Sequence, residues 1–210
     1  MPNRGDRGGA KTRARIAEVA TELFLEQGFD EVTIAQVAAA VGVSKVTVFA
    51  HFKSKEDLLL DRLPDAVDML RTAIRGRAED VGPAQAFRTL ALTLVDERHV
   101  LSGVGDGVEP MLRTIAGSPA LIARLRVFEH EVEAALAADL RNDARFTGDP
   151  DLVAALLIAA YRTVAVAAAQ RRLAGDDLAE ITAIHRDRLN QAFDAVEHGI
   201  SPGGTTPPLG

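Results

Sequence analysis

The sequence predicts an all-α fold of about nine helices, in which a small three-helix domain is followed by a larger helical domain. Three observations support this prediction. Apolar residues recur at the three- and four-residue spacing of helices, and no segment has the alternating pattern of a strand. Ala, Leu and Val dominate while aromatic residues make up only 4% of the chain, and Ala and Leu favour helix. Residues that typically start and stop helices separate the apolar stripes.

The chain is expected to divide into two domains, with a polar segment at each end. Residues 1–9 are Gly-rich and residues 200–210 are rich in Pro, Gly and Thr, so we expect both segments to be disordered. The three-helix domain is predicted over residues 10–57. The second domain is predicted over residues 58–199.

Residues that typically cap or end helices define the helices of the first domain. A helix over 10–27 carries one apolar face, and Gly28 follows it where a left-handed C-cap is expected. The Thr33-x-x-Gln36 pattern is a capping box that opens the next helix, which ends before Gly42. Ser44-to-Phe52 then forms a third helix, with the serine as its N-cap.

The second domain is predicted to begin with a long helix. Ser54-x-x-Asp57 signals its start, and its apolar stripe continues to Ile74. Pro64 falls inside this helix, where it removes a hydrogen bond and should produce a kink. Five further helices are expected from the positions of Gly, Pro and capping residues, over 84–101, 108–116, 120–141, 151–174 and 177–198.

Charge and cysteine content limit the functions that the chain can have. The absence of cysteine excludes disulfides, thiol catalysis and cysteine-ligated zinc. Residues 1–62 hold nine basic and nine acidic residues, so the net charge of −6 lies entirely in residues 63–210. Phosphate would repel that acidic part while the first domain docks. We find no N-terminal apolar segment and no run of about 18 apolar residues, so we expect a soluble, cytoplasmic protein without membrane contact.

Residues 33–52 have the pattern of a helix-turn-helix, whose second helix can enter the major groove of DNA. Lys45, Val46 and Thr47 fall at the exposed start of that helix, next to Ser44 at its N-cap. Lys45 can donate to guanine O6 and N7, while Val46 and the Thr47 methyl group can pack on a thymine methyl. These four residues are therefore candidate DNA contacts, and the alternative for each is a solvated surface position.

Phosphate contacts are expected from residues around the same motif. His51 lies at the end of the second helix, and Lys55 lies at a helix N-terminus, which favours an anion. Thr33 opens the preceding helix and can contact phosphate in the same way. Arg4 and Arg7 either enter a minor groove or belong to a disordered tail.

At this point the sequence resembles the TetR family of bacterial transcriptional regulators. The resemblance covers about residues 10–60, and the remainder matches only in length and number of helices. It rests on Gly28-Phe29, Thr33-Ile34-x-x-Val37-Ala38, Gly42-Val43-Ser44, Thr47, Phe52 and Ser54-Lys55-Glu56-x-Leu58. It implies a homodimer in which each subunit has a DNA-binding head and a helical body. The body would bind a small molecule and dimerise through its last two long helices.

Phe49 departs from the family pattern, which usually has Tyr at this position with a hydroxyl group that commonly contacts phosphate. Phenylalanine keeps the packing of the ring and loses that hydrogen bond, which is worth about 0.5–1.5 kcal/mol. We therefore expect Phe49 to remain a DNA contact. The missing hydrogen bond should adjust the strength of DNA binding without abolishing it.

The segment 151–174 is apolar nearly all round, so we expect it to be buried on several sides. Together with 177–198 it predicts a four-helix dimer interface, and the alternative is a core helix within one chain. A dimer would place two second helices about one duplex turn, ~34–36 Å, apart on a pseudo-palindromic operator.

A pocket for a hydrophobic or aromatic effector is expected among helices of the second domain, and plain core packing is the alternative for each of its residues. Tyr161 is the only tyrosine, and its hydroxyl needs a partner from protein, water or ligand. The candidate lining residues are Met69, Phe87, Leu94, Met111, Phe128, Leu157 and Tyr161.

No catalytic, cofactor or metal site is expected. The Gly-rich segment 102–107 lacks the preceding strand and the spacing of a nucleotide-binding loop, and the five histidines are scattered without a His-Glu-x-x-His pattern. Together with the helix-turn-helix, the resemblance implies a ligand-responsive transcriptional regulator, most simply a dimeric repressor associated with the bacterial nucleoid. The alternatives are an activator, a helical small-molecule binder whose head contacts protein, and an all-α enzyme.

Overall fold

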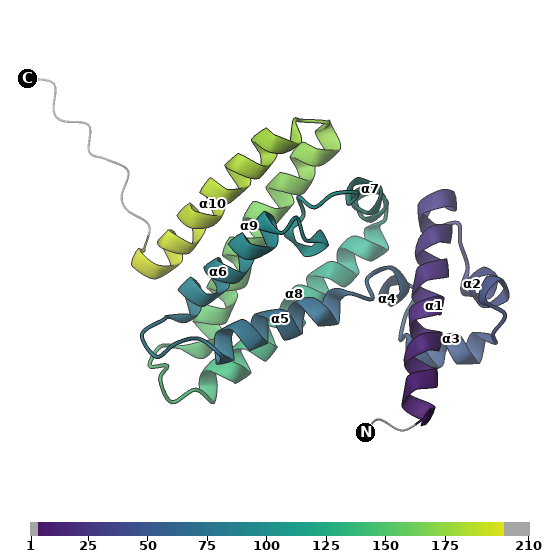
Figure 1. The fold of residues 1–210 in the computed structure, drawn as a ribbon, viewed down its shortest axis with the longest axis horizontal. Coiled ribbons are helices and arrows are strands. Elements are labelled where there is room, and N and C mark those ends of the chain that lie inside the picture. Colours follow the sequence, from purple (N-terminus) through teal and green to yellow (C-terminus); the bar gives the residue numbers. More distant parts are fainter. Residues whose placement is uncertain (1–3, 200–210) are drawn as a thin grey trace, which may run out of the picture. The chain divides into compact units, whose positions relative to one another are not determined.

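The computed structural model describes residues 4–199, with side chains from Gly8 onward, and over this range it contains helices and no strand (Figure 1). The described residues form ten α-helices and a short 3-10 helix, η1, in place of about nine predicted helices. They are α1 Arg4–Gln27, α2 Ile34–Val41, α3 Lys45–His51, α4 Glu56–Leu59, α5 Leu63–Arg75, α6 Pro83–Asp96, η1 Val100–Ser102, α7 Glu109–Gly117, α8 Pro119–Arg141, α9 Pro150–Ala174 and α10 Leu178–His198.

The additional helix arises because the predicted long helix is broken and not kinked. α4 ends at Leu59, the chain turns, and α5 begins at Leu63. Pro64 is thus the second residue of a new helix, where a missing N–H costs little because that group would have no partner within the helix. The prediction of a kink at Pro64 is therefore wrong.

The start of α1 also differs from the prediction. The helix begins at Arg4. The sequence instead predicted that residues 1–9 are disordered and that the helix begins at Ala10. Each glycine of this segment disfavours helix by about 1 kcal/mol relative to alanine, so the glycine content alone misleads about where α1 begins. Residues 1–3, the side chains of Arg4 and Arg7, and the tail 200–210 lie outside the part that is described.

The chain forms two compact units. The first, which we call the head, comprises residues up to Pro64 together with Pro110–Val127. Its core includes Leu121 of α8, which is fully buried, so α7 and the first half of α8 contribute to a domain that the sequence assigned to residues 10–57. Two polar contacts join this insertion to the rest of the head: Ser118 Oγ lies 3.1 Å from Asp30 Oδ1, and Arg124 Nε donates to Asp57 Oδ1 at 2.8 Å.

The second unit, which we call the body, comprises Asp65–Glu109 and the chain from Phe128 onward. α9 and α10 run side by side, and α6 packs against α10 (Figure 1). Phe87 lies at the centre of an aromatic cluster, with its ring centroid 5.3 Å from Tyr161 and 5.2 Å from Phe193.

α9 is less buried than its composition predicts. One side packs in the body core, but Leu152, Leu156 and Val166 are each about half exposed. Of the described helices it is also the one that is long and apolar enough to cross a membrane by length and composition. Core helices of soluble proteins pass the same test, and α9 packs its buried side against α10.

Candidate nucleic-acid interface

The first helix of the helix-turn-helix begins with the predicted capping box. The Gln36 backbone N–H donates to Thr33 Oγ1 at 3.3 Å, and the Thr33 N–H donates to Gln36 Oε1 at 2.8 Å. The Thr33 hydroxyl also donates to Gln36 Oε1 at 2.7 Å. Two backbone donors that a helix start leaves unpaired are thus satisfied, which fixes where α2 begins.

The turn between the two helices depends on Gly42. This residue is left-handed, with φ 77° and ψ 32°, a conformation that costs a residue with a Cβ about 1–2 kcal/mol. The turn is closed by hydrogen bonds from the Val43 N–H to the Ala38 carbonyl at 2.9 Å and from the Gly42 N–H to the Ala39 carbonyl at 3.1 Å. The glycine therefore sets the direction in which α3 leaves the turn.

α3 is held at both ends and along its inner face. The Thr47 N–H donates to Ser44 Oγ at 3.0 Å, as the N-cap prediction requires, and the two hydroxyl oxygens lie 2.9 Å apart. Val48 is fully buried and Phe52 nearly so, and both belong to the head core. Because Val48 and Phe52 face inward, the opposite side of this short helix must face solvent.

The outward face of α3 is apolar and basic. Val46 is 78% exposed and Phe49 is 54% exposed, and Ser44 and Lys45 are exposed beside them. The Phe49 ring is therefore only partly covered by the head. Two large apolar side chains in water on one short helix, next to a lysine, form a surface suited to contact with another molecule.

The predicted phosphate contacts are more constrained than the sequence suggests. The Thr33 hydroxyl is engaged by Gln36, and Lys55 Nζ lies 4.4 Å from the Phe29 ring centroid and 3.4 Å from the Asp30 carbonyl oxygen. This cation–π contact holds the ammonium group close to the head surface. His51 is partly buried.

Arg13 of α1 is a residue that the sequence reasoning missed. Its guanidinium carbon lies 4.3 Å from the Phe52 ring centroid. This cation–π contact joins α1 to the residue that ends α3. A basic residue on α1 was the available signal, but its partner becomes evident only once the helices are packed.

The structure separates the predicted effector residues. Phe87 and Leu157 are buried in the body core, and Phe128 and Tyr161 pack against it. Met111 packs against the head core, on a helix that belongs almost entirely to the head. The remaining two, Met69 and Leu94, are half-buried and buried respectively.

Tyr161 finds its hydrogen-bond partner within the protein. Its hydroxyl donates to the Leu101 carbonyl at 2.9 Å. Burial raises the pKa of Tyr161 to about 12, so this hydroxyl stays protonated and acts as a donor.

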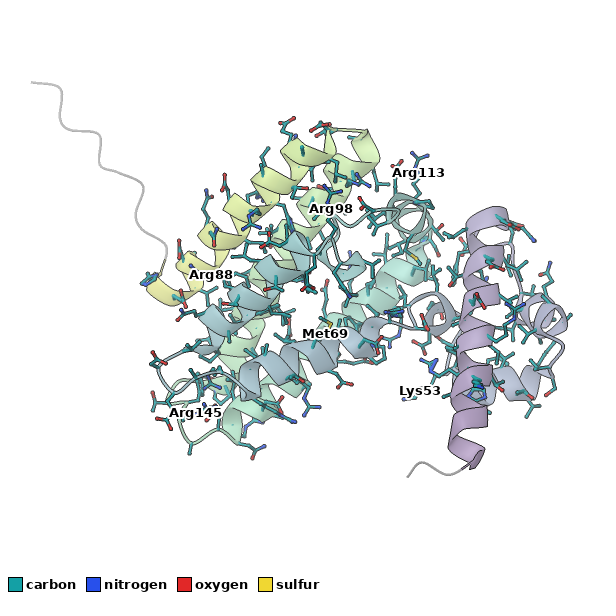
Figure 2. The ribbon with its side chains drawn as sticks, in the orientation of Figure 1. Lys53, Met69, Arg88, Arg98, Arg113 and Arg145 are labelled. Carbon is teal, nitrogen blue, oxygen red and sulfur yellow. The ribbon has the colours of Figure 1, made fainter. Side chains whose placement is uncertain are left out.

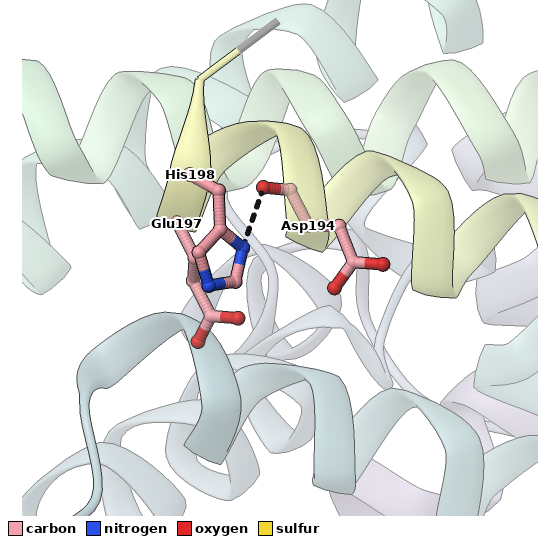
Figure 3. Close-up of side chains that lie close together, drawn as sticks. All are labelled: Asp194, Glu197 and His198. Atoms are coloured by element: carbon pink, nitrogen blue, oxygen red, sulfur yellow. Dashed lines mark hydrogen bonds between the residues drawn. The ribbon is translucent and has the colours of Figure 1, made fainter. Parts of the chain in front are cut away.

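Asp194, Glu197 and His198 on the last turns of α10 lie close enough together to be considered as metal ligands (Figure 3). Arg88 Nη2, however, donates to Asp194 Oδ1 at 2.6 Å and to Glu197 Oε2 at 2.7 Å. His198 Nδ1 donates to the Asp194 carbonyl at 3.2 Å. An arginine thus already engages both exposed carboxylates, and we assign this group to the surface.

Known proteins share this arrangement. The sequence profile of bacterial regulatory proteins of the tetR family matches residues 16–61. The HTH-type transcriptional regulator TcmR of Streptomyces glaucescens is 30% identical over 159 residues, which cover 73% of this chain and 70% of TcmR.

The solved structures that are similar over most of the chain include FadR and NalD. FadR of Thermus thermophilus, a TetR-family repressor in complex with lauroyl-CoA, has 25% identity and a TM-score of 0.51, covering 94% of this chain and 100% of FadR. NalD of Pseudomonas aeruginosa, the secondary repressor of a multidrug efflux pump, has 20% identity and a TM-score of 0.55, covering 88% of this chain and 97% of NalD, which bears on the fold alone. From its helix-turn-helix and its similarity to TcmR, the chain belongs to the TetR family of transcriptional regulators.

Proposed function

We propose that this chain is a dimeric repressor that binds a pseudo-palindromic operator through α3 and leaves it when a small apolar or aromatic effector binds in the body. The observation that carries the proposal is the outward face of α3. Lys45, Val46 and Phe49 project from a helix whose start, turn and inner face are all fixed by the contacts described above. Such a helix is pre-organised to present the same three side chains to a groove without further ordering.

The chemistry of the three side chains suggests which part of a base pair each one contacts. Lys45 supplies a donor for guanine O6 or N7, whereas Val46 and Phe49 can pack on thymine methyl groups. The cap restrains Thr47, because its N–H and hydroxyl both lie at hydrogen-bond distance from Ser44. We therefore expect Thr47 to support the helix start more than it reads a base.

Dimerisation is supported by the exposed stripe on α9. Leu152, Leu156 and Val166 fall within one narrow arc of the helix, and each is about half exposed in the single chain. A second copy related by a two-fold axis would cover the stripe and place two α3 helices about one duplex turn, ~34–36 Å, apart.

The effector is expected to be apolar because the body core around Phe87, Phe128 and Tyr161 is aromatic. The similar FadR structure contains lauroyl-CoA, which carries a long acyl chain and is consistent with this expectation. To release DNA, the effector must bind the DNA-incompetent state more tightly, and DNA must weaken effector binding by the same factor. We place the protein in the bacterial cytoplasm, at the nucleoid when it is bound to DNA.

Selection of bound duplexes from a random DNA pool tests the proposal. We expect a pseudo-palindrome with half-sites about one turn apart, bound with an affinity that falls steeply with salt. Lys45→Ala should weaken binding, whereas Arg141→Ala, which removes a positive charge from the body, should not. If no sequence is enriched and binding stays weak in protein stripped of ligand by unfolding and refolding, the head does not read DNA, and a protein partner becomes the better explanation.

A further inference from the structure

An open polar cavity of about 340 Å³ lies in the body, where the segment after α5 meets the segment after α8. Figure 2 labels Arg145, which reaches the end of α5 by donating to the Arg75 carbonyl. The effector residues predicted from the sequence do not line this cavity. Its polar lining consists of Arg75, Arg77, Asp139, Asn142, Asp143 and Arg145.

The two carboxylates of the cavity are already engaged. Asp139 accepts from Arg71 through Nε at 2.8 Å and Nη2 at 2.9 Å, and also from Arg75. Asp143 accepts from Arg145 Nε at 2.9 Å, and Arg77 Nη1 lies 2.6 Å from its other oxygen. Carboxylates held in this way are poor ligands for an incoming cation, because binding it would require breaking arginine pairs.

Two of the three lining arginines have structural roles. The Arg77 side chain is 4% exposed and donates to the Ile74 and Val81 carbonyls as well as pairing with Asp143. Arg145 pairs with Asp143 and donates to the Arg77 carbonyl at 2.9 Å. These two residues close the ends of α5 and α8 and shape the cavity wall.

Arg75 differs from them. Its side chain is 59% exposed, and within the described part of the chain its guanidinium group donates to a single acceptor, Asp139. Asp139 would still be held by Arg71 if Arg75 turned to another partner. Arg75 can therefore offer further guanidinium N–H donors and a positive charge to a molecule in the cavity. The planar guanidinium group suits carboxylate and phosphate groups.

The charges of the lining favour an anion. Three guanidinium groups face two carboxylates, which leaves one positive charge in excess at the cavity. Asp68 and Glu79 act on Arg71 and Arg145 from exposed positions, where water and salt screen them. The volume falls within the range of pockets for small molecules and exceeds that of a single water many times.

We propose that this cavity binds a small organic anion, a carboxylate or a phosphate, with Arg75 as its principal donor. The site lies within the body, and its lining includes Ile74 of the body core but none of the residues predicted for an apolar effector. Arg77, Arg145 and Asp143 act as its scaffold. Without the anion, Arg75 donates to Asp139. The bound anion accepts hydrogen bonds from the same guanidinium group.

Calorimetric titration of the full chain with inorganic phosphate and with succinate, at constant ionic strength, tests the proposal. We expect saturable binding of at least one of the two probes by the native chain. Arg75→Ala should weaken it about tenfold or more, as the loss of a charge-assisted hydrogen bond implies, and Arg75→Lys should weaken it less. Arg141→Ala is the matched control, because Arg141 lies at the end of α8 but pairs with Asp151 outside the cavity.

Three results would overturn the proposal: no saturable binding of either probe, equal affinity in the native chain and Arg75→Ala, or equal weakening by Arg141→Ala. Arg75→Ala is expected to fold, because Asp139 keeps its paired contact with Arg71; thermal unfolding checks this. Binding of phosphate alone would indicate a phosphate ester, and binding of succinate alone a carboxylate.

Discussion

Asp139 shows how a buried charge is stabilised in the body. Its side chain is 4% exposed, yet hydrogen bonds from Arg71, and then from Arg75, lower its pKa against the opposing effect of burial. An ionised carboxylate in such a position depends on its partners, because an unpaired buried charge is costly.

We predict that Asp139→Ala destabilises the protein by about 2–3 kcal/mol, since it leaves Arg71 without its paired acceptor. Arg75→Ala should cost less than about 1 kcal/mol, because its side chain is largely exposed. Urea unfolding of both variants measures the difference. Equal and small effects would show that the network adds nothing to stability.

His185 is a buried histidine whose charge state depends on folding. Burial lowers its pKa to about 4, and the positive charge of Arg188 adds to the decrease. The unfolded chain therefore binds the proton more readily than the folded chain.

It follows that the contribution of His185 to stability is fully present above the ordinary histidine pKa of about 6.5 and is lost as the pH falls from there towards about 4. We predict that His185→Leu flattens the dependence of the unfolding free energy on pH in this window. Unfolding measured in steps between pH 7 and 4 tests this, with His130→Leu as an exposed control. A slope unchanged in His185→Leu would mean that the imidazole takes up its proton in the folded state.

At the scale of elements, residues that act on their near neighbours in sequence were predictable. The Thr33 capping box, the Gly42 turn and the Ser44 cap are all present, because each depends on contacts within about five residues. The end of α4 was not predictable in this way. Leu58, Leu59 and Leu60 are all buried in the head core, and three successive residues cannot face one side of a helix, so the chain leaves the helix there.

The cap of α3 gives a prediction at this scale. Ser44→Ala should destabilise the head by about 1 kcal/mol because the Thr47 N–H loses its acceptor, and Ser44→Gly should cost only a few tenths. Chemical denaturation followed by circular dichroism measures both. If alanine were no worse than glycine at this position, the serine would not be acting as a cap.

At the scale of the whole molecule, the sequence predicted the all-α class, the helix-turn-helix and two domains, but not that residues 110–127 pack with the first of them. Met111 and Leu121 looked like body residues, yet they pack in the head core. Apolar periodicity identifies the buried face of a helix but not the helix that covers it. For the same reason, the sequence placed Lys55 at a helix N-terminus but did not reveal that its ammonium group lies against Phe29.

The exposed stripe of α9 leads to a prediction about assembly. Leu156→Lys should shift the protein from dimer to monomer, because a charge would be buried without a partner at the covered stripe. Gln85→Lys adds the same charge on α6 and should leave the mass unchanged. Light scattering after size-exclusion chromatography distinguishes the two states. A Leu156→Lys variant that keeps the native mass would remove α9 from the interface.

The account depends most on the claim that the outward face of α3 reads DNA bases. The direct test is selection of preferred duplexes by the native chain and by Lys45→Asn and Val46→Asn, sequenced in parallel. We predict that each variant changes the preferred base at one position in both half-sites and leaves the other positions unchanged, because base contacts specify sequence whereas phosphate contacts do not. Identical base preferences in all three proteins would contradict the claim, since α3 would then contribute no sequence information.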